Sequence, residues 1–333
     1  MRRATTAPVI GLALAGVFAA PAFAAPEPVA EHGSFSILAE NDVFYRSDRD
    51  YTSGVALAYT TGATDTPAGL VALGNGLSFL LSPGDIRAGY EIGQDIFTPA
   101  NTAAPNPPLS QRPYAGFLWA SLALLATDER HLNQLQLQLG VVGPLAQGQE
   151  AQVFVHSILG ESKPRGWDFQ LRNEPAVQFT YERAYKLIPP RTALGFVFDV
   201  EPHIGAAAGN IYDYVAGGAM ARAGINLPND FGPLRLDPAL PGSNFFQARG
   251  GFSAYVFAGV DVRAIARNIF LDGNTWQASR HVDKIPYVGD LQLGAALELG
   301  GVRLSYMHVF RTKEYHGQAV ADQFGSINLA FQT

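Results

Sequence analysis

The stretch from Leu132 to Val141, LNQLQLQLGV, decides the fold class. Its leucines stand at every second position from Leu135 to Leu139, and glutamines fill the positions between them. Successive side chains of an extended chain point to opposite faces, so this stretch has one apolar face and one polar face. The pattern predicts a β-strand with its apolar face against an apolar environment.

The same period of two recurs along the rest of the chain. From Gly250 to Arg263 apolar residues occupy every second position, and only Phe257 interrupts the polar face. Further candidate strands are Ser34–Asn41, Thr52–Thr61, Asp85–Phe97, Tyr114–Ala126, Glu174–Lys186, Thr192–Ala206, Tyr212–Gly224, Tyr287–Leu299, Val302–Thr312 and Gln323–Thr333. With the two segments above they make twelve, separated by turns that contain Gly, Pro, Asn or Asp.

An even number of alternating strands fits a closed antiparallel barrel, because lipid offers an open sheet edge no hydrogen-bond partner. A soluble sandwich that buries the same apolar faces against each other is the alternative. Polar faces suited to a lumen and aromatic residues near strand ends favour the barrel. Those aromatic residues are Tyr90, Phe97, Tyr114, Phe117, Tyr181 and Tyr214. We therefore expect an all-β fold, a twelve-stranded antiparallel transmembrane barrel of a Gram-negative outer membrane.

The composition of the 333 residues agrees with a folded, exported protein. Hydrophobic residues make up 47% and charged residues 16%, which excludes a disordered chain. The net charge of −6 provides no basic field, so we expect no nucleic-acid partner. Cysteine is absent, which excludes disulfides, thiolate metal sites and a cysteine nucleophile.

The N-terminus has the pattern of a signal peptide. Arg2 and Arg3 precede the apolar stretch Ala7–Ala20, and a small-x-small cleavage site follows at Ala22–Ala24. The alternative, a membrane anchor, is disfavoured because the stretch is shorter than the roughly 20 apolar residues that span a bilayer. We expect residues 1–25 to be removed and residues 26–333 to form one barrel domain.

The lengths of the connections predict the orientation of the barrel. Long loops of such barrels lie outside the cell. The long segments here are Thr98–Pro113, Gly143–Asn173, Asn226–Arg249 and Asn268–Pro286. Within the second of them, apolar residues between Gln147 and Leu159 recur with a rough helical period that Gly160 closes, so we expect a short helix in an extracellular loop.

Two groups of residues have side chains suited to chemistry. Asn41 and Asp42 end the first predicted strand, and Thr52 lies across the hairpin from them. They supply oxygen ligands of the kind that calcium prefers, although Asn-Asp also simply begins turns. His156 lies on the predicted loop helix, where a neutral imidazole can take a proton from water. The alternative is a structural or merely exposed histidine.

Several phrases of the sequence resemble the LpxR-like lipid A 3'-O-deacylases of Gram-negative outer membranes. They are ENDVF at 40–44, DRDYTSG at 48–54, QDIFTP at 94–99, VGP at 142–144, GQEAQ at 148–152 and HSILG at 156–160. These phrases cover most of residues 34–175 in the order that the family has.

The resemblance implies a site at the outer rim of the barrel, between its wall and a loop helix. The implied activity is calcium-dependent hydrolysis of the ester that holds the 3'-acyloxyacyl chain of lipid A. The implied base that activates water is His156, and the implied calcium ligand is Asp42. Asn41 and Thr52 match family positions that orient ligands or substrate. The expected partners are lipopolysaccharide and outer-membrane lipids, and we expect a monomer.

The sequence departs from the family pattern in two places. In the family, the glutamate that follows the histidine lies one residue later in the chain than Glu161 does here. Whether Glu161 can take the same role therefore depends on the direction of the chain after the helix ends. A lysine that some members carry after the Gln-Asp-Ile phrase has no counterpart. Binding of the lipid A phosphates then falls to Arg112, Lys163 or Arg165.

Two other functions compete with this interpretation. The first is another outer-membrane lipid esterase or phospholipase with a serine nucleophile, for which Ser53, Ser157 and Ser162 are the nearby serines. The second is a non-enzymatic barrel or porin, because a fold does not determine a function.

Overall fold

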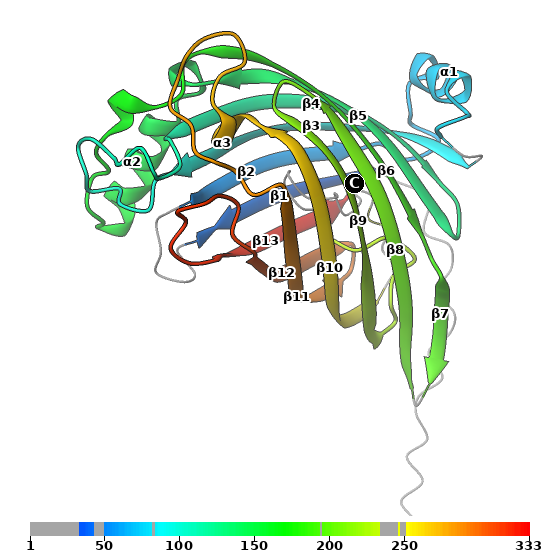
Figure 1. The fold of residues 1–333 in the computed structure, drawn as a ribbon. Helices are drawn as coiled ribbons and strands as arrows, with labels where there is room; N and C mark the ends of the chain where they lie inside the picture. Colours follow the sequence, from blue (N-terminus) through cyan, green and yellow to red (C-terminus); the bar gives the residue numbers. More distant parts are fainter. Residues whose placement is uncertain (1–32, 43–49, 82–83, 194, 234–245, 247–250) are drawn as a thin grey trace, which may run out of the picture.

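A computed structural model describes residues 33–42, 50–81, 84–193, 195–233, 246 and 251–333 (Figure 1). The predicted signal peptide, residues 1–25, lies outside the described residues. No helix among the described residues is long and apolar enough to cross a membrane.

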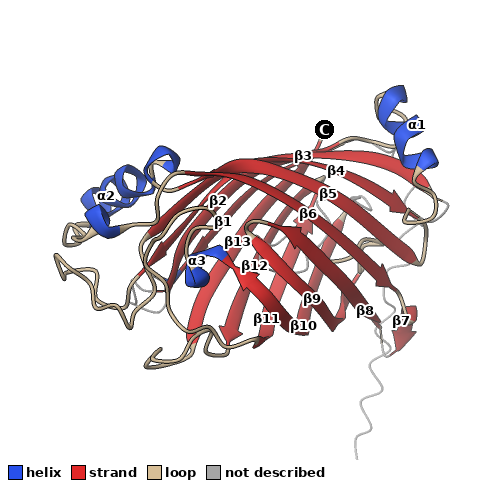
Figure 2. Ribbon diagram, turned by 45° about the horizontal axis from the view of Figure 1, so that its top comes forward, coloured by secondary structure: helices blue, strands red, loops and turns tan. Residues whose placement is uncertain are grey.

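In the described part of the chain, thirteen strands form one antiparallel sheet, and twelve of them close into a barrel (Figures 1 and 2). Closure comes from the pairing of β6 with β8, which runs from Gln178↔Gly209 to Ala184↔His203. The short strand β7 (Ile188–Ala193) is the extra one and pairs only with β8. The barrel strands are β1 (Ser34–Asn41), β2 (Asp50–Thr60), β3 (Asp85–Thr98), β4 (Ala115–Thr127), β5 (His131–Val142), β6 (Glu174–Tyr185), β8 (Phe196–Gly209), β9 (Tyr212–Ile225), β10 (Phe252–Asn268), β11 (Tyr287–Leu299), β12 (Val302–Arg311) and β13 (Asp322–Gln332). The predicted twelve-stranded barrel is confirmed.

The two faces of the strands differ as the alternation predicts. On β5 the glutamines point inward and are buried, whereas Leu139 points outward and is 51% exposed. Other exposed apolar residues on outward faces are Ile37, Val55, Leu57, Ile92, Val177, Phe179, Ile204, Val215, Val256, Val260, Leu293 and Leu304. The outer wall is therefore apolar, as contact with lipid requires.

Charged side chains fill the inside of the barrel. The guanidinium of Arg222 lies 2.6 Å from Asp199, 2.9 Å from Glu201 and 2.5 Å from Asp230. Asp230 comes from the connection between β9 and β10 and also pairs with Arg303. Ion pairs of this kind hold strands together across the lumen, where each buried charge needs a partner.

Four of the aromatic residues expected at the membrane interface are buried instead. Phe97, Phe117 and Tyr214 belong to the main core cluster, and Tyr114 packs 4.6 Å from the ring of Trp167. The prediction of an interfacial girdle is wrong for these four, because nearness to a strand end does not decide whether a side chain faces lipid, faces the lumen or is covered by another segment.

The antiparallel order places successive connections on alternate rims of the barrel. We call the end where β1 finishes, at Asn41, the site rim, and the end where β13 finishes, at Gln332, the terminal rim. The connections 99–114, 143–173 and 269–286 lie on the site rim. The prediction that Asn226–Arg249 lies on the same rim as these long connections is wrong. It connects β9 to β10, which pair at Ile225↔Ala254 on the terminal rim.

The described residues also form three helices outside the strands of the barrel (Figure 2). The predicted loop helix is α2 (Gly148–Leu159), after the single turn η2 (Pro144–Ala146) on the site rim. Two further helices, α1 (Ala68–Gly76) on the terminal rim and α3 (Ile269–Asp272) on the site rim, have no counterpart in the sequence prediction. The single turn η3 (Trp167–Phe169) lies in the same connection as α2.

Candidate active site

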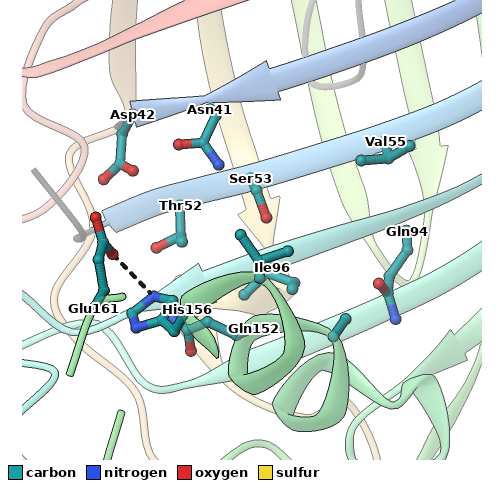
Figure 3. Close-up of a pocket in the computed structure, with 12 residues that line it drawn as sticks. Asn41, Asp42, Thr52, Ser53, Val55, Gln94, Ile96, Gln152, His156 and Glu161 are labelled. Atoms are coloured by element: carbon teal, nitrogen blue, oxygen red, sulfur yellow. Dashed lines mark ion pairs between the residues drawn. The ribbon is translucent and has the colours of Figure 1, made fainter. Parts of the chain in front are cut away.

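A cleft lies between the wall of the barrel and helix α2. Its lining comes from the ends of β1 and β2, from β3 and from α2 and the residues after it (Figure 3). The lining residues are Asn41, Asp42, Thr52, Ser53, Val55, Gln94, Ile96, Ala151, Gln152, Val155, His156 and Glu161. All five residues predicted for the site, Asn41, Asp42, Thr52, His156 and Glu161, therefore border one cleft.

Two glycines let the start of α2 approach the wall. A Cβ atom on Gly148 would lie 2.9 Å from the Cα of Gly116, on β4. Such an approach excludes any larger residue unless the backbone moves. The side-chain amide of Gln94 donates to the carbonyl of Ala146 over 2.6 Å, and the indole of Trp167 donates to Gln152 over 2.9 Å. These contacts fix α2 against β3 and β4.

His156 lies in the last turn of α2 with its ring toward the cleft, and its side chain is almost fully buried. Its Nδ1 atom is 2.7 Å from the backbone carbonyl of Ser162. A carbonyl can only accept a hydrogen bond, so Nδ1 donates its proton there. In the neutral ring the Nε2 atom then carries the lone pair, which is the form that a general base needs.

Glu161 reaches the same ring because the chain reverses after the helix. Gly160 adopts the left-handed conformation, with φ 71°, and the amide of Glu161 donates to the carbonyl of His156 over 2.9 Å. The carboxylate of Glu161 lies 3.6 Å from Nε2 of His156 and is 38% exposed (Figure 3). The one-position offset from the family pattern thus does not remove this glutamate from the cleft.

Asn41, Asp42 and Thr52 border the cleft from the wall side (Figure 3). The Asp42 side chain is 1% exposed, and the Thr52 hydroxyl lies 2.7 Å from the hydroxyl of Thr98. Thr52 lies where the pairing of β2 with β3 is irregular, between Tyr51 and Ser53. The predicted proximity of Asn41 and Asp42 to Thr52, across the hairpin of β1 and β2, is therefore confirmed.

The donor atoms of the cleft suit a hard cation. Asp42 and Glu161 carry carboxylates, and Asn41 and Thr52 add neutral oxygen atoms. No cluster of three or more His, Asp or Glu side chains arranged for a metal occurs among the described residues. Calcium accepts mixed sets of carboxylate and neutral oxygen ligands, so this donor set fits calcium better than zinc.

Sequence reasoning missed several residues that line the cleft. Gln94 and Gln152 occur in phrases that resemble the family, but no role was predicted for either of them. Thr98 stands in one of the same phrases and supports Thr52 from behind. Ile96 and Val55 belong to the outward row of the wall, so no pattern in the sequence separates them from ordinary lipid-facing residues.

Arg112 is not available to bind a lipid phosphate. Its side chain is buried and lies 2.9 Å from the carboxylate of Glu314. Burial alone disfavours its charge, but Glu314 raises the pKa of Arg112 above its usual value. The prediction is wrong for this arginine, because its loop folds inward. Lys163 and Arg165 are exposed on the site rim.

The chain is similar to known proteins over almost its whole length. The model of the family described as outer membrane protein LpxR matches residues 10–333. The chain is similar to the solved structure of LpxR from Salmonella typhimurium, with 23% identity and a TM-score of 0.75 over 90% of this chain and 100% of that one. The beta domain of the Bordetella autotransporter BrkA is less similar, with 10% identity and a TM-score of 0.46 over 92% of this chain and 100% of that one.

No curated protein sequence matches the chain. The family model nevertheless covers almost its whole length, including every strand of the barrel and every residue of the cleft. The solved Salmonella structure supports the same fold. The chain therefore belongs to the family of the outer membrane protein LpxR.

Proposed function

We propose that the protein is a lipid A 3'-O-deacylase that uses calcium to hydrolyse the ester of the 3'-acyloxyacyl chain. Family membership supports this reaction class. The observation that carries the proposal is the meeting of His156, Asp42 and Thr52 in one cleft on the outer wall. In the outer membrane, residues 26–333 would act as one domain after loss of the signal peptide, and we expect them to work as a monomer on lipopolysaccharide.

The position of the cleft suits a lipid substrate. Val55 lines it and is 52% exposed, and Leu57 and Ile92 continue the apolar wall below it with 43% and 55% exposure. An acyl chain can lie along this wall in the membrane while its ester reaches the polar end of the cleft. The substrate would then not have to leave the lipid layer.

In the proposed mechanism His156 acts as the general base. Its Nε2 atom takes a proton from water while the water oxygen attacks the ester carbonyl carbon. The hydrogen bond from Nδ1 to Ser162 holds the ring in the required tautomer. Glu161, 3.6 Å from Nε2, stabilises the positive charge that the ring gains. The ring then gives this proton to the departing sugar oxygen, and the products are the free acyl acid and a 3'-hydroxyl.

Wall-side residues would hold calcium and orient the ester. Asp42 would hold the ion, and the oxygen atoms of Asn41 and Thr52 would complete its protein ligands. Calcium, when bound, supplies positive charge that stabilises the oxyanion. The amide group of Asn41 can also donate a hydrogen bond to the ester oxygen. Thr98 keeps the Thr52 hydroxyl in place.

The competing functions make different demands on the chain. A serine esterase needs a serine beside the base; Ser53 lines the cleft, whereas Ser157 is exposed and bonds to the carbonyl of Phe154. Ser53→Ala is therefore expected to keep its activity if water attacks directly. A porin needs a water-filled lumen, whereas buried ion pairs such as Arg222 with Asp199 occupy this one.

The test is mass spectrometry of lipid A from outer membranes that contain the protein, with calcium or with a chelator. We expect a calcium-dependent loss of mass equal to the 3'-acyloxyacyl group. His156→Ala should abolish it, and the matched variant His316→Ala, at an exposed histidine of the same rim, should not. Unchanged lipid A beside a folded barrel would refute the proposed substrate.

A further inference from the structure

Residues 67–81 form an apolar segment on the outside of the barrel, far from the cleft. We call this segment the outer strap. It contains α1, connects β2 to β3 on the terminal rim, and lies at the end of the barrel opposite α2 (Figures 1 and 2). No charged residue occurs between Asp65 and Asp85. A connection exposed to water would be expected to carry polar residues at most positions.

One side of the outer strap packs on the outward face of β3 and β4. Leu81 of the strap forms a buried cluster with Ile86 and Leu124, which are 7% and 4% exposed. Ile92 and Leu118 belong to the same outward rows but lie beyond the strap, and they are 55% and 38% exposed. The strap therefore covers a part of the wall that would otherwise face lipid.

The outer strap is held in place at several points. A Cβ atom on Gly74 would lie 3.0 Å from the side chain of Ile86, so the helix sits directly on the wall. The hydroxyl of Tyr181, on β6, donates to the carbonyl of Leu80 over 3.0 Å. Directly before the strap, the hydroxyls of Thr61 and Thr66 lie 2.6 Å apart. These contacts make the strap a fixed part of the barrel.

The other side of the outer strap is apolar as well. Phe79 is 80% exposed and Leu73 is 49% exposed. A helix that is apolar on both sides belongs in a protein core or in a membrane. Around the same rim the outer wall is also apolar, with Phe196, Phe252 and Leu299 at least half exposed at strand ends. The free side of the strap thus continues the lipid-facing surface of the barrel.

We propose that the outer strap inserts into the acyl-chain layer of the membrane leaflet at the terminal rim, with Phe79 and Leu73 in contact with phospholipid. The strap widens the apolar wall at one point of its circumference and resists movement of the barrel along the membrane normal. It thereby sets the height of the cleft on the opposite rim relative to the bilayer. This inference rests on the packing of the strap and is independent of the reaction at the cleft.

The absence of cysteine allows a direct test. The full chain with Phe79→Cys is labelled with a nitroxide and folded into vesicles of palmitoyl-oleoyl-phosphatidylcholine. Collisions of the label with oxygen, which enters the bilayer, are compared with collisions with a polar nickel chelate. The matched control is Glu129→Cys, in the exposed turn between β4 and β5 on the same rim. Leu73→Cys provides a second position if the first variant does not fold.

We expect the oxygen-to-nickel collision ratio to be several-fold higher at position 79 than at position 129. Equal ratios at the two positions would place the strap in water and overturn the proposal. A label at 79 that neither reagent reaches, and that becomes accessible when the protein is diluted with excess phospholipid, would show a second copy as the occupant. That result would also overturn it.

Discussion

Replacing Glu161 with glutamine removes one charge beside the proposed base and keeps the size of the side chain. Coulomb's law gives about 1.2 kcal/mol in water, and about 4.6 kcal/mol at an effective dielectric of about 20, for unit charges at the observed 3.6 Å. The carboxylate is 38% exposed, so solvent screens it and the lower part of this range applies. A loss of about 1–2 kcal/mol of stabilisation of the protonated ring corresponds to a roughly 5- to 30-fold lower kcat.

The assay measures release of the acyl acid from purified lipid A in detergent, at saturating calcium and varied substrate. We expect kcat to fall while KM changes little, because the ring gains its charge only as the water attacks. Glu150→Gln is the matched control, since Glu150 is exposed on the first turn of the same helix. Equal activity of the two variants would refute the contact between Glu161 and the ring. A loss that extra calcium restores would instead identify Glu161 as a calcium ligand.

Three further outcomes are expected. Asp42→Asn should raise the half-maximal calcium concentration at least about tenfold without loss of heat-modifiable folding, and an unchanged calcium titration would exclude Asp42 as a ligand. Gly148→Val should displace α2 from Gly116 and lower activity by about 100-fold in a folded barrel; normal activity would contradict the close approach. Asp230→Asn should destabilise the barrel by about 3 kcal/mol in urea unfolding, because Arg303 loses its partner, and a neutral effect would refute this. Burial opposes ionisation of Asp230, but the arginines hold its pKa below the usual value, so the wild-type advantage should persist at neutral pH and disappear only as the pH falls below the ordinary range of an aspartate.

Much of the site was accessible from the sequence because it is built from local features. Asn41 ends β1, Asp42 follows it, and Thr52 lies near the start of β2, so a hairpin alone brings them together. The end of α2 at Gly160 was also predictable, since glycine commonly ends helices in the left-handed conformation. The link between these two groups came from the resemblance to a family, because nothing in the alternation of strands says where a loop helix will dock.

Other features depended on contacts between distant parts of the chain. Helix α1 follows a proline and contains three glycines, and its buried face exists only because the wall of β3 lies beneath it. Arg112 has the sequence context of an exposed loop cation, but it is buried in an ion pair with Glu314. Propensity cannot reveal either outcome, since both arise from partners far away along the chain.

The sequence by itself determined the alternation of apolar and polar residues, and with it the closed barrel, its lipid-facing wall and its polar interior. These follow from the chain because side-chain direction in a strand depends only on whether a position is odd or even. The tertiary structure decided which rim each connection occupies, that Glu161 returns to His156, and that the outer strap covers the wall. These features depend on chain reversal and on packing across long distances in sequence, which no local pattern encodes.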